Sequence, residues 1–302
     1  MTPSSGSLGA TSPLPFESAR SFVLSTTLPL VAQAAGDGSY LQAVVLGIVQ
    51  GVTEMLPISS SGHLILLPRF FGWEDQGLAF DAAMHVGTLL AVLLYFHQDL
   101  WRMFTAGLAS VFKGRHTPDS RLAWAVVLGT IPVAVAGLLL KDTIEHVFRN
   151  PLLVAGNLAL WGVVLWLADR YGRRRRSVAQ MDLRDGLLIG LAQALALVPG
   201  TSRSGITMSA GLALGLTREA AARFSFLLSV PAVTAAGALA VLDLAKAGPG
   251  QPWGPMGVAV AVSAVTGLLS IHLLLRLIQR VGMAPFTVYR LALAAFCVYI
   301  FV

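Results

Sequence analysis

Long apolar runs recur along this chain of 302 residues and leave few architectures open to it. Apolar residues make up 55% of the sequence and charged residues only 12%, whereas roughly a quarter of the residues in a water-soluble domain are charged. A helix that crosses a bilayer needs about 20 consecutive apolar residues. Runs near that length lie at 79–97, 122–140, 152–168, 222–244, 257–275 and 287–302. The sequence therefore predicts an all-α polytopic membrane protein.

The first 39 residues differ in composition from the rest of the chain. They are rich in Ser, Thr, Pro and Gly and contain one short apolar patch at 21–35. Arg20 before this patch and the small-residue triplet Ala32-Gln33-Ala34 within it are typical of a secretory signal with a cleavage site. A flexible extension explains the composition equally well. We expect no functional site in residues 1–39 and assign 40–302 to a single membrane domain.

Basic residues gather at the ends of the apolar runs. The net charge is +6, and the densest basic stretch, Arg173 to Arg176, follows the run 152–168. This placement is typical of an orientation signal and argues against nucleic-acid binding. The basic clusters are Lys113 with Arg115, Arg170–Arg176, and Arg276 with Arg280. When all three are placed in the cytoplasm they fit one topology, in which residue 302 lies outside.

Two shorter apolar segments are interrupted and do not look like ordinary spans. Residues 41–56 run into PISSSGH at 57–63, and residues 186–198 run into PGTSRSG at 199–205. Each interruption carries Pro, Gly and several hydroxyls, and each flanking arm is marginal for crossing a bilayer. Non-helical backbone at membrane depth persists only where protein or a water-filled cavity satisfies it. We therefore predict two re-entrant helical hairpins.

The two interrupted segments also resemble each other at a constant spacing. The matched pairs are Gly47 with Gly190, Gln50 with Gln193, Ser59 with Ser202, Ser61 with Ser204 and Gly62 with Gly205. Three full spans follow each segment, and an odd number of spans per unit inverts the second copy. This pattern predicts an inverted-topology repeat, with one copy at about 41–169 and the other at about 186–302. Chance similarity between two Gly-rich apolar segments is the alternative.

Arg203 gives the clearest chemical signal in the sequence. It lies between Ser202 and Ser204, after a Pro-Gly turn and before an apolar helix. A helix N-terminus offers free N–H groups to an anion, and a guanidinium binds two oxygens at once. The combination predicts a phosphate-binding site. The alternative is an arginine that pairs with a buried carboxylate to hold helices together.

The first interrupted segment carries groups suited to catalysis. Gln50 and Glu54 are four residues apart and share a helix face, and His63 follows a Ser-Ser-Ser-Gly run. A carboxylate, a hydroxyl and an imidazole support phosphoryl transfer through an activated nucleophile or a metal-held water. The alternative for each residue alone is a packed polar group, and for His63 alone that explanation is the better one. If the carboxylate, the hydroxyl and the imidazole lie together opposite the anion site at Arg203, catalysis is the better explanation of all three.

Ionisable residues elsewhere in the apolar runs are few. Asp81 and His85 lie four apart on one face of the run 79–97, and charges at membrane depth are costly enough to suggest a role. We expect them to support the site or to pack helices. Cys297 is the only cysteine, so it cannot form a disulfide within the chain.

These motifs resemble those of the undecaprenyl-diphosphate phosphatase family, which is also known for bacitracin resistance. The first signature, a Glu or Gln shortly before a Glu, corresponds to Gln50 and Glu54 and continues as LPISSSGH at 56–63. The second, PGxSRSxxT, runs from Pro199 to Thr207. FDAAMHVGT at 80–88 and FSFLLSVP at 224–231 are also typical. The resemblance covers about 41–302, which is nearly everything but the first 39 residues.

The resemblance implies hydrolysis of a polyprenyl diphosphate lipid, undecaprenyl diphosphate, to the monophosphate and inorganic phosphate. This reaction recycles the carrier lipid for peptidoglycan synthesis, at the outer face of the bacterial plasma membrane. The implied catalytic residues are Glu54, Ser60, His63 and Arg203. The implied phosphate-binding residues are Ser59, Ser61, Ser202, Arg203, Ser204 and Thr207, with Gln50, Asp81 and His85 in support.

The resemblance also implies help from a divalent cation, Mg²⁺ or Ca²⁺, with Glu54 as a ligand. Gln50 is the uncharged variant of its position, so a site built from two carboxylates is not expected. We expect no organic cofactor. The sequence does not fix the oligomeric state, and a homodimer stays open.

Two questions of mechanism stay open from the sequence. Either Ser60 or His63 could attack the phosphorus, with Glu54 assisting as base or through a metal and the other residue in support. The alternative function is a transporter or flippase of undecaprenyl phosphate, because broken helices in inverted repeats also build carriers. The clustered nucleophile and base favour hydrolysis, since carrying an anion needs no nucleophile.

Overall fold

The computed structural model describes residues 38–140, 150–246 and 252–301. The chain falls into two units, Met1–Gln42 and Ala43–Val302, and the packing below is that of the second unit. The signal or flexible extension predicted for 1–39 lies outside the described residues, except for the last two positions, where the first described helix begins.

Helices make up nearly all of the described chain. They are α2 (Gly38–Met55), α3 (Ser60–Phe71), α4 (Gly77–Tyr95), α5 (His97–Lys113), α6 (Pro118–Leu139), α8 (Pro151–Tyr171), α9 (Leu183–Ala194), α10 (Arg203–Ala213), α11 (Arg218–Lys246), α12 (Trp253–Val281) and α13 (Ala284–Phe301), with short 3₁₀ turns η1 (Val178–Gln180) and η2 (Leu195–Leu197). Within the described ranges there is no β-strand, only one isolated bridge between Arg176 and Leu216. The all-α prediction is confirmed.

Several of these helices can cross a membrane. In the described chain, α6, α8, α11, α12 and α13 are each long and apolar enough to do so. Helices α4 and α5 pass the same test as a pair, with a bend of 79° between them. These elements lie at the six apolar runs, so the prediction of a multi-pass membrane protein is confirmed.

Local sequence signals set many of the helix boundaries. Thr117 and Ser120 form a capping box at the start of α6, and the Asn150 side chain caps the first turn of α8. Gly72 and Gly114 end α3 and α5 in the left-handed conformation that glycine adopts without strain. Polar residues and glycines at these positions therefore set where the helices begin and end.

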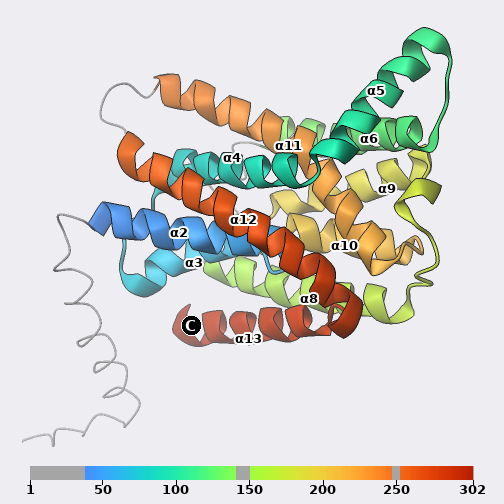
Figure 1. Cartoon of the computed structure of the whole chain (residues 1–302). Helices are drawn as coiled ribbons and strands as arrows, with labels where there is room; N and C mark the ends of the chain where they lie inside the picture. The colour runs from blue at the N-terminus through green and yellow to red at the C-terminus, as the bar shows by residue number, and fades with distance from the viewer. Residues whose placement is uncertain (1–37, 141–149, 247–251, 302) are drawn as a thin grey trace, which may run out of the picture. The chain divides into compact units, whose positions relative to one another are not determined.

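The interrupted helices lie among the long ones (Figure 1). Glycines at the crossings allow the helix backbones to approach closely. Helix α6 packs on α9, α4 packs on α11 and α12, and α8 packs on α10 and α13. A Cβ atom added at Gly190 of α9 would lie 2.2 Å from the carbonyl oxygen of Gly129 on α6. A Cβ atom at Gly51 of α2 would lie 2.7 Å from the carbonyl oxygen of Ser263 on α12. Small residues at such crossings bring backbones together inside membranes.

A continuous apolar core lies behind the two interruptions. It joins Met55 of α2, Phe96 beside the α4–α5 bend, Met208 of α10, Phe226 of α11 and Ile271 of α12, all almost fully buried. The ends of α2 and the body of α10 are therefore held by side chains from the long helices. This packing brings the two interruptions, which are far apart in sequence, into one place.

Candidate active site

Both interruptions turn at a serine with a positive φ. Ser59 has a φ of 75° and Ser202 a φ of 72°, a region that residues other than glycine seldom adopt. Each hydroxyl accepts a hydrogen bond from a backbone N–H three residues on, Gly62 at 3.3 Å and Gly205 at 3.1 Å. The two serines therefore cap the helices that follow, and α3 and α10 start directly after them with parallel local designs.

Arg290 of α13 joins the two interruptions. Its side chain is fully buried, and within the described ranges its guanidinium donates to backbone carbonyl oxygens alone. These oxygens belong to Pro57, Asn157, Leu158, Gly200 and Thr201, at 2.9–3.2 Å. One side chain thus satisfies carbonyls from both breaks and from α8, which fixes the breaks relative to each other.

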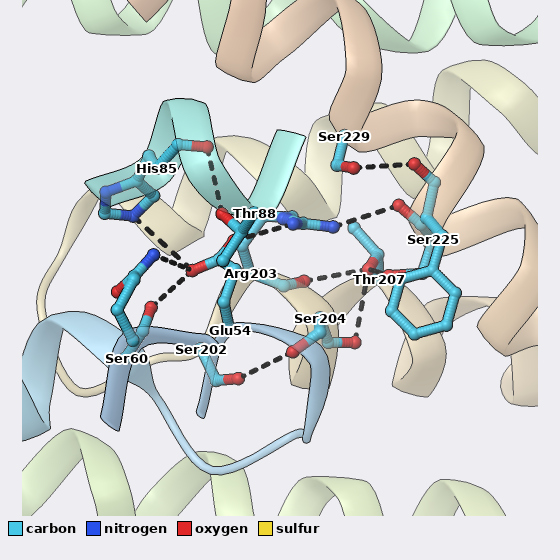
Figure 2. A network of polar contacts seen from close by, with 12 residues as sticks. Glu54, Ser60, His85, Thr88, Ser202, Arg203, Ser204, Thr207, Ser225 and Ser229 are labelled. Carbon is cyan, nitrogen blue, oxygen red and sulfur yellow. Dashed lines mark hydrogen bonds and ion pairs between the residues drawn. The ribbon is translucent and has the colours of Figure 1, made fainter. Parts of the chain in front are cut away.

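Glu54, at the end of α2, is the centre of a buried polar network (Figure 2). Its Oε1 accepts a hydrogen bond from Arg203 Nη2 at 2.7 Å. Its Oε2 accepts one from the Ser60 hydroxyl at 2.5 Å and a longer one from the Gln50 amide at 3.4 Å. His85 Nε2 lies 3.4 Å from the same oxygen. The carboxylate therefore connects both interrupted segments with α4.

Arg203 is held on its far side by α11. Its Nη1 donates to the carbonyl oxygen of Ser225 at 3.0 Å, and the Ser225 hydroxyl lies 2.7 Å from the hydroxyl of Thr207. Because a guanidinium has five N–H donors, contacts with Glu54 and Ser225 leave several for a bound anion. Arg203 thus fits both roles considered for it, since it pairs with a buried carboxylate and also lines a cavity.

His85 is oriented by its own helix. Its Nδ1–H donates to the carbonyl oxygen of Asp81 at 2.7 Å, which leaves Nε2 facing Glu54. The Asp81 carboxylate accepts a hydrogen bond from Gln76 Nε2 at 2.5 Å, and Thr88 donates to the His85 carbonyl at 2.9 Å. The structure thus places His85 in direct reach of the central carboxylate and Asp81 one turn away.

A cavity of about 340 Å³ opens beside this network. Its polar wall consists of Glu54, Ser60, Ser61, Asp81, His85, Gln193, Ser202 and Arg203. Its apolar wall includes Leu64, Ile65, Val133, Ala196, Leu197, Ala232, Val233 and Ala236. A charged group with an apolar tail suits such a divided cavity, because each part meets surface of its own polarity.

His63 lies away from this cavity. Its Nδ1–H donates to the carbonyl oxygen of Ser59 at 2.7 Å, and its Nε2 accepts from the Tyr289 hydroxyl at 2.7 Å. The ring also stacks on that of Tyr289. Both nitrogens of a neutral imidazole are therefore engaged by the protein, on the side of α3 that faces α13.

The predicted phosphate-binding residues divide into two groups. Ser61, Ser202 and Arg203 line the cavity. The other three are buried and bond within the protein: Ser59 caps α3, Ser204 donates to the carbonyl oxygen of Leu56, and Thr207 contacts Ser225. Gln50 lies beside Glu54, behind the cavity wall.

Sequence reasoning missed three contributors. Arg290 lies within the last apolar run, where its charge was the available signal. Ser225, which holds Arg203, lies in the FSFLLSVP stretch, and nothing local marks it as part of the site. Gln193 was noted as the partner of Gln50 in the repeat, but the structure also places it in the cavity wall.

The donor set around Glu54 does not fit a divalent cation held by protein alone. Within the described residues, no three His, Cys, Asp or Glu side chains come together in a ligand arrangement. Both oxygens of Glu54 already accept hydrogen bonds, from Arg203 and Ser60.

Comparison with known proteins extends over the same region. Residues 43–296 match the sequence profile of the bacitracin resistance protein BacA. The chain is 52% identical over 264 residues to undecaprenyl-diphosphatase 2 of Stutzerimonas stutzeri, which covers 86% of this chain and 98% of that protein. It is 51% identical over 254 residues to the undecaprenyl-diphosphatase of Alteromonas mediterranea, covering 84% and 96% of the two chains. The undecaprenyl-diphosphatase of Nitrosococcus oceani is 50% identical over 262 residues, covering 87% and 99%. The matched region contains both interruptions and the whole cavity wall.

Proposed function

The chain belongs to the family of the bacitracin resistance protein BacA, and on that premise we propose that it hydrolyses undecaprenyl diphosphate to undecaprenyl phosphate and inorganic phosphate. One observation carries this proposal. The Ser60 hydroxyl bonds to Glu54 at 2.5 Å inside a cavity that also contains Arg203 and an apolar wall. A nucleophile, a base and an anion-binding cation thus share a space suited to a lipid phosphate.

In the proposed mechanism the diphosphate enters beside Arg203. The phosphate oxygens compete with Glu54 for the guanidinium, and a carboxylate that loses this partner becomes a better base. Ser60 Oγ then attacks the terminal phosphorus while its proton passes to Glu54. The bond from that phosphorus to the bridging oxygen breaks, and undecaprenyl phosphate leaves with the bridging oxygen.

The second step returns the protein to its starting state. A water oxygen attacks the phosphorus on Ser60, the bond from phosphorus to Oγ breaks, and Oγ takes back the proton from Glu54. Inorganic phosphate is released. Arg203 and the N–H groups at the starts of α3 and α10 stabilise the charge on the transferred group in both steps.

We favour Ser60 over His63 as nucleophile because of where each group lies. Ser60 faces the cavity and bonds to a base, whereas His63 bonds to Ser59 and Tyr289 outside it. We propose that His63 positions the first interruption by joining α3 to α13. His85, rather than His63, supplies the imidazole near the central carboxylate.

The nucleophile can be identified from the covalent intermediate. Purified protein would be mixed with undecaprenyl diphosphate labelled at the terminal phosphate and quenched within one turnover. We expect release of labelled phosphate and an acid-stable label on the peptide containing Ser60, because a phosphoserine ester survives acid. An acid-labile label on His63 would contradict the choice of nucleophile, and no phosphate release from folded protein would contradict the function.

We also propose the inverted repeat and a position in the bacterial plasma membrane with the cavity reached from outside. Support comes from paired features at one spacing: the positive φ values of Ser59 and Ser202, and the tight glycine contacts of Gly47 with α12 and Gly190 with α6. The basic clusters that would face the cytoplasm lie at the C-terminal ends of α5, α8 and α12 and in the connection after α8.

The same repeat would suit a carrier of undecaprenyl phosphate, so transport needs its own test. A Glu54→Gln variant lacks the proposed base but keeps the shape of the side chain. Flux of lipid phosphate across reconstituted vesicles would be compared with empty vesicles. Flux equal to that of empty vesicles rejects transport, whereas flux by this inactive variant would establish a second activity.

A further inference from the structure

Gln193 of α9 has a buried side chain. Its exposed fraction is 0%, and in the part of the chain that the structure describes neither its Nε2 nor its Oε1 has a hydrogen-bond partner. Buried polar groups in folded proteins are nearly always paired, and an unpaired amide costs stability. An unpaired buried amide at the wall of a cavity is a candidate for contact with a ligand, because a ligand could supply the missing hydrogen bonds.

The place of Gln193 in the cavity indicates which ligand. It lines the same wall as Ser202 and Arg203, so the neighbouring groups are a hydroxyl and a cation. A carboxamide Nε2 adds two N–H donors to that wall. Phosphate oxygens accept hydrogen bonds, so an anion with many oxygens would satisfy these donors together.

Comparison with Gln50 explains why the amide is free. Gln50 occupies the matching position in the first interrupted segment and donates to Glu54, four residues on. Four residues after Gln193 the chain has Leu197 instead of a carboxylate. The second segment therefore keeps the donor without its internal acceptor.

We propose that Gln193 is a substrate-binding residue, whose Nε2–H donates to a phosphate oxygen of the diphosphate beside Arg203. This inference rests on the proposed function and adds a contact outside both sequence signatures. It also predicts that removing the amide lowers activity without lowering stability, because the amide has no partner among the described residues of the free protein.

The test uses Gln193→Met, which keeps the length of the side chain and removes its hydrogen bonds. We expect the melting temperature in detergent to rise or stay unchanged, because no bond is lost and an unpaired polar group is removed. We expect kcat/KM for undecaprenyl diphosphate to fall about tenfold to a hundredfold, since a hydrogen bond to a charged group is lost. In Gln193→Glu the kcat/KM should fall further, because a carboxylate there would repel the anion.

The matched control is Gln279→Met on α12, where the amide is exposed and donates to Glu219; its kcat/KM should equal that of the unmodified protein. Wild-type kcat/KM in Gln193→Met would overturn the proposal. So would a large fall in melting temperature for both Gln193 variants, which would mean that the amide has a partner within the protein.

A readout without turnover separates this inference from the proposed function. Inorganic diphosphate would be added to each protein and the shift in melting temperature recorded. We expect a shift for the unmodified protein and for Gln279→Met, and a smaller one for Gln193→Met. Equal shifts would overturn the role of Gln193 even if hydrolysis is confirmed. A lost shift in Gln193→Met would support that role even if hydrolysis fails.

Discussion

Arg203 shows how one side chain can serve structure and chemistry together. Its guanidinium joins Glu54 on one side and the Ser225 carbonyl on the other. The contact with the Ser225 carbonyl holds the plane of the guanidinium before any substrate arrives, so in the proposed mechanism its donors are already directed when a phosphate oxygen replaces Glu54. The geometry depends on donors at fixed angles, which only a guanidinium provides.

Replacing Arg203 with Lys should therefore remove most activity. A lysine ammonium is a point charge that cannot reach Glu54, the Ser225 carbonyl and a phosphate in the same arrangement. We expect kcat to fall about a hundredfold or more, as on loss of one preorganised donor to a developing oxyanion. The rate of phosphate release from undecaprenyl diphosphate at saturating substrate measures this kcat. Near wild-type turnover by the Lys variant would show that charge alone is sufficient.

At the residue scale the sequence predicted chemical types better than orientations. Glu54, Ser60 and Arg203 meet as expected, because two hydroxyl-rich breaks in apolar segments have few ways to be satisfied except by each other. His63 could not be placed from sequence. Whether it faces the cavity or α13 depends on the turn at Ser59, whose positive φ is set by the packed fold rather than by a glycine.

At the scale of elements, the interrupted helices depend on backbone contact with their neighbours. Helix α9 touches α6 through Gly186 and Gly190, and α2 touches α12 through Gly47 and Gly51. Lipid gives no hydrophobic driving force between helices, so close packing has to hold these short arms in place. Any added volume at the crossings would displace the residues that line the cavity.

Gly190→Ala should therefore destabilise the protein, and Gly156→Ala should not. The added Cβ at Gly190 would lie 2.2 Å from the Gly129 carbonyl oxygen, whereas nothing lies within 4 Å of one at Gly156 on α8. We expect a loss of about 1–3 kcal/mol for the first, as for overpacked cores, and a change within about 1 kcal/mol for the second. Thermal unfolding in detergent measures both. Equal stability of the two variants would mean that α6 and α9 separate at little cost.

At the scale of the whole molecule, a polar loop closes one end of the helix bundle. Arg176, in the connection after α8, donates to both carboxylate oxygens of Asp185 at the start of α9 and to the carbonyl oxygen of Leu214 after α10. Burial alone would raise the pKa of Asp185, but hydrogen bonds from Arg176 and from the Asp182 backbone hold it below its ordinary value of 3.8. The ionised Asp185 carboxylate thus holds the loop in place through its hydrogen bonds with Arg176.

This pair predicts a stability that falls in acid. Because the folded-state pKa of Asp185 is lowered, its contribution is present above pH 3.8 and is lost as the pH falls through the folded-state value. We expect the melting temperature of the wild type to fall over that range. In Asp185→Asn the melting temperature should be lower at neutral pH, and the gap between the two proteins should narrow in acid. A constant gap would show that Asp185 does not act through its charge.

The helical membrane architecture was predictable from sequence because the six apolar runs have no other stable environment. The bend between α4 and α5 was not, since the sequence around Phe96 has neither Pro nor Gly to mark a break. The charge of Arg290 within the last apolar run could have marked it as a candidate, but its role could not be predicted. Its five acceptors are backbone carbonyls, and no residue type in the sequence indicates which carbonyls lie near it.

The clamp at Arg290 has a consequence for the order of events during synthesis. Pro57, one of its acceptors, is separated from it by 233 residues. Ribosomes add only about 5–20 residues per second, so both interruptions emerge well before the side chain that joins them. A nascent chain that has inserted all its earlier helices still lacks this joint. The proposed catalytic groups would therefore be aligned only after α13 has been made and docked, and we expect a partly made protein in the membrane to be inactive.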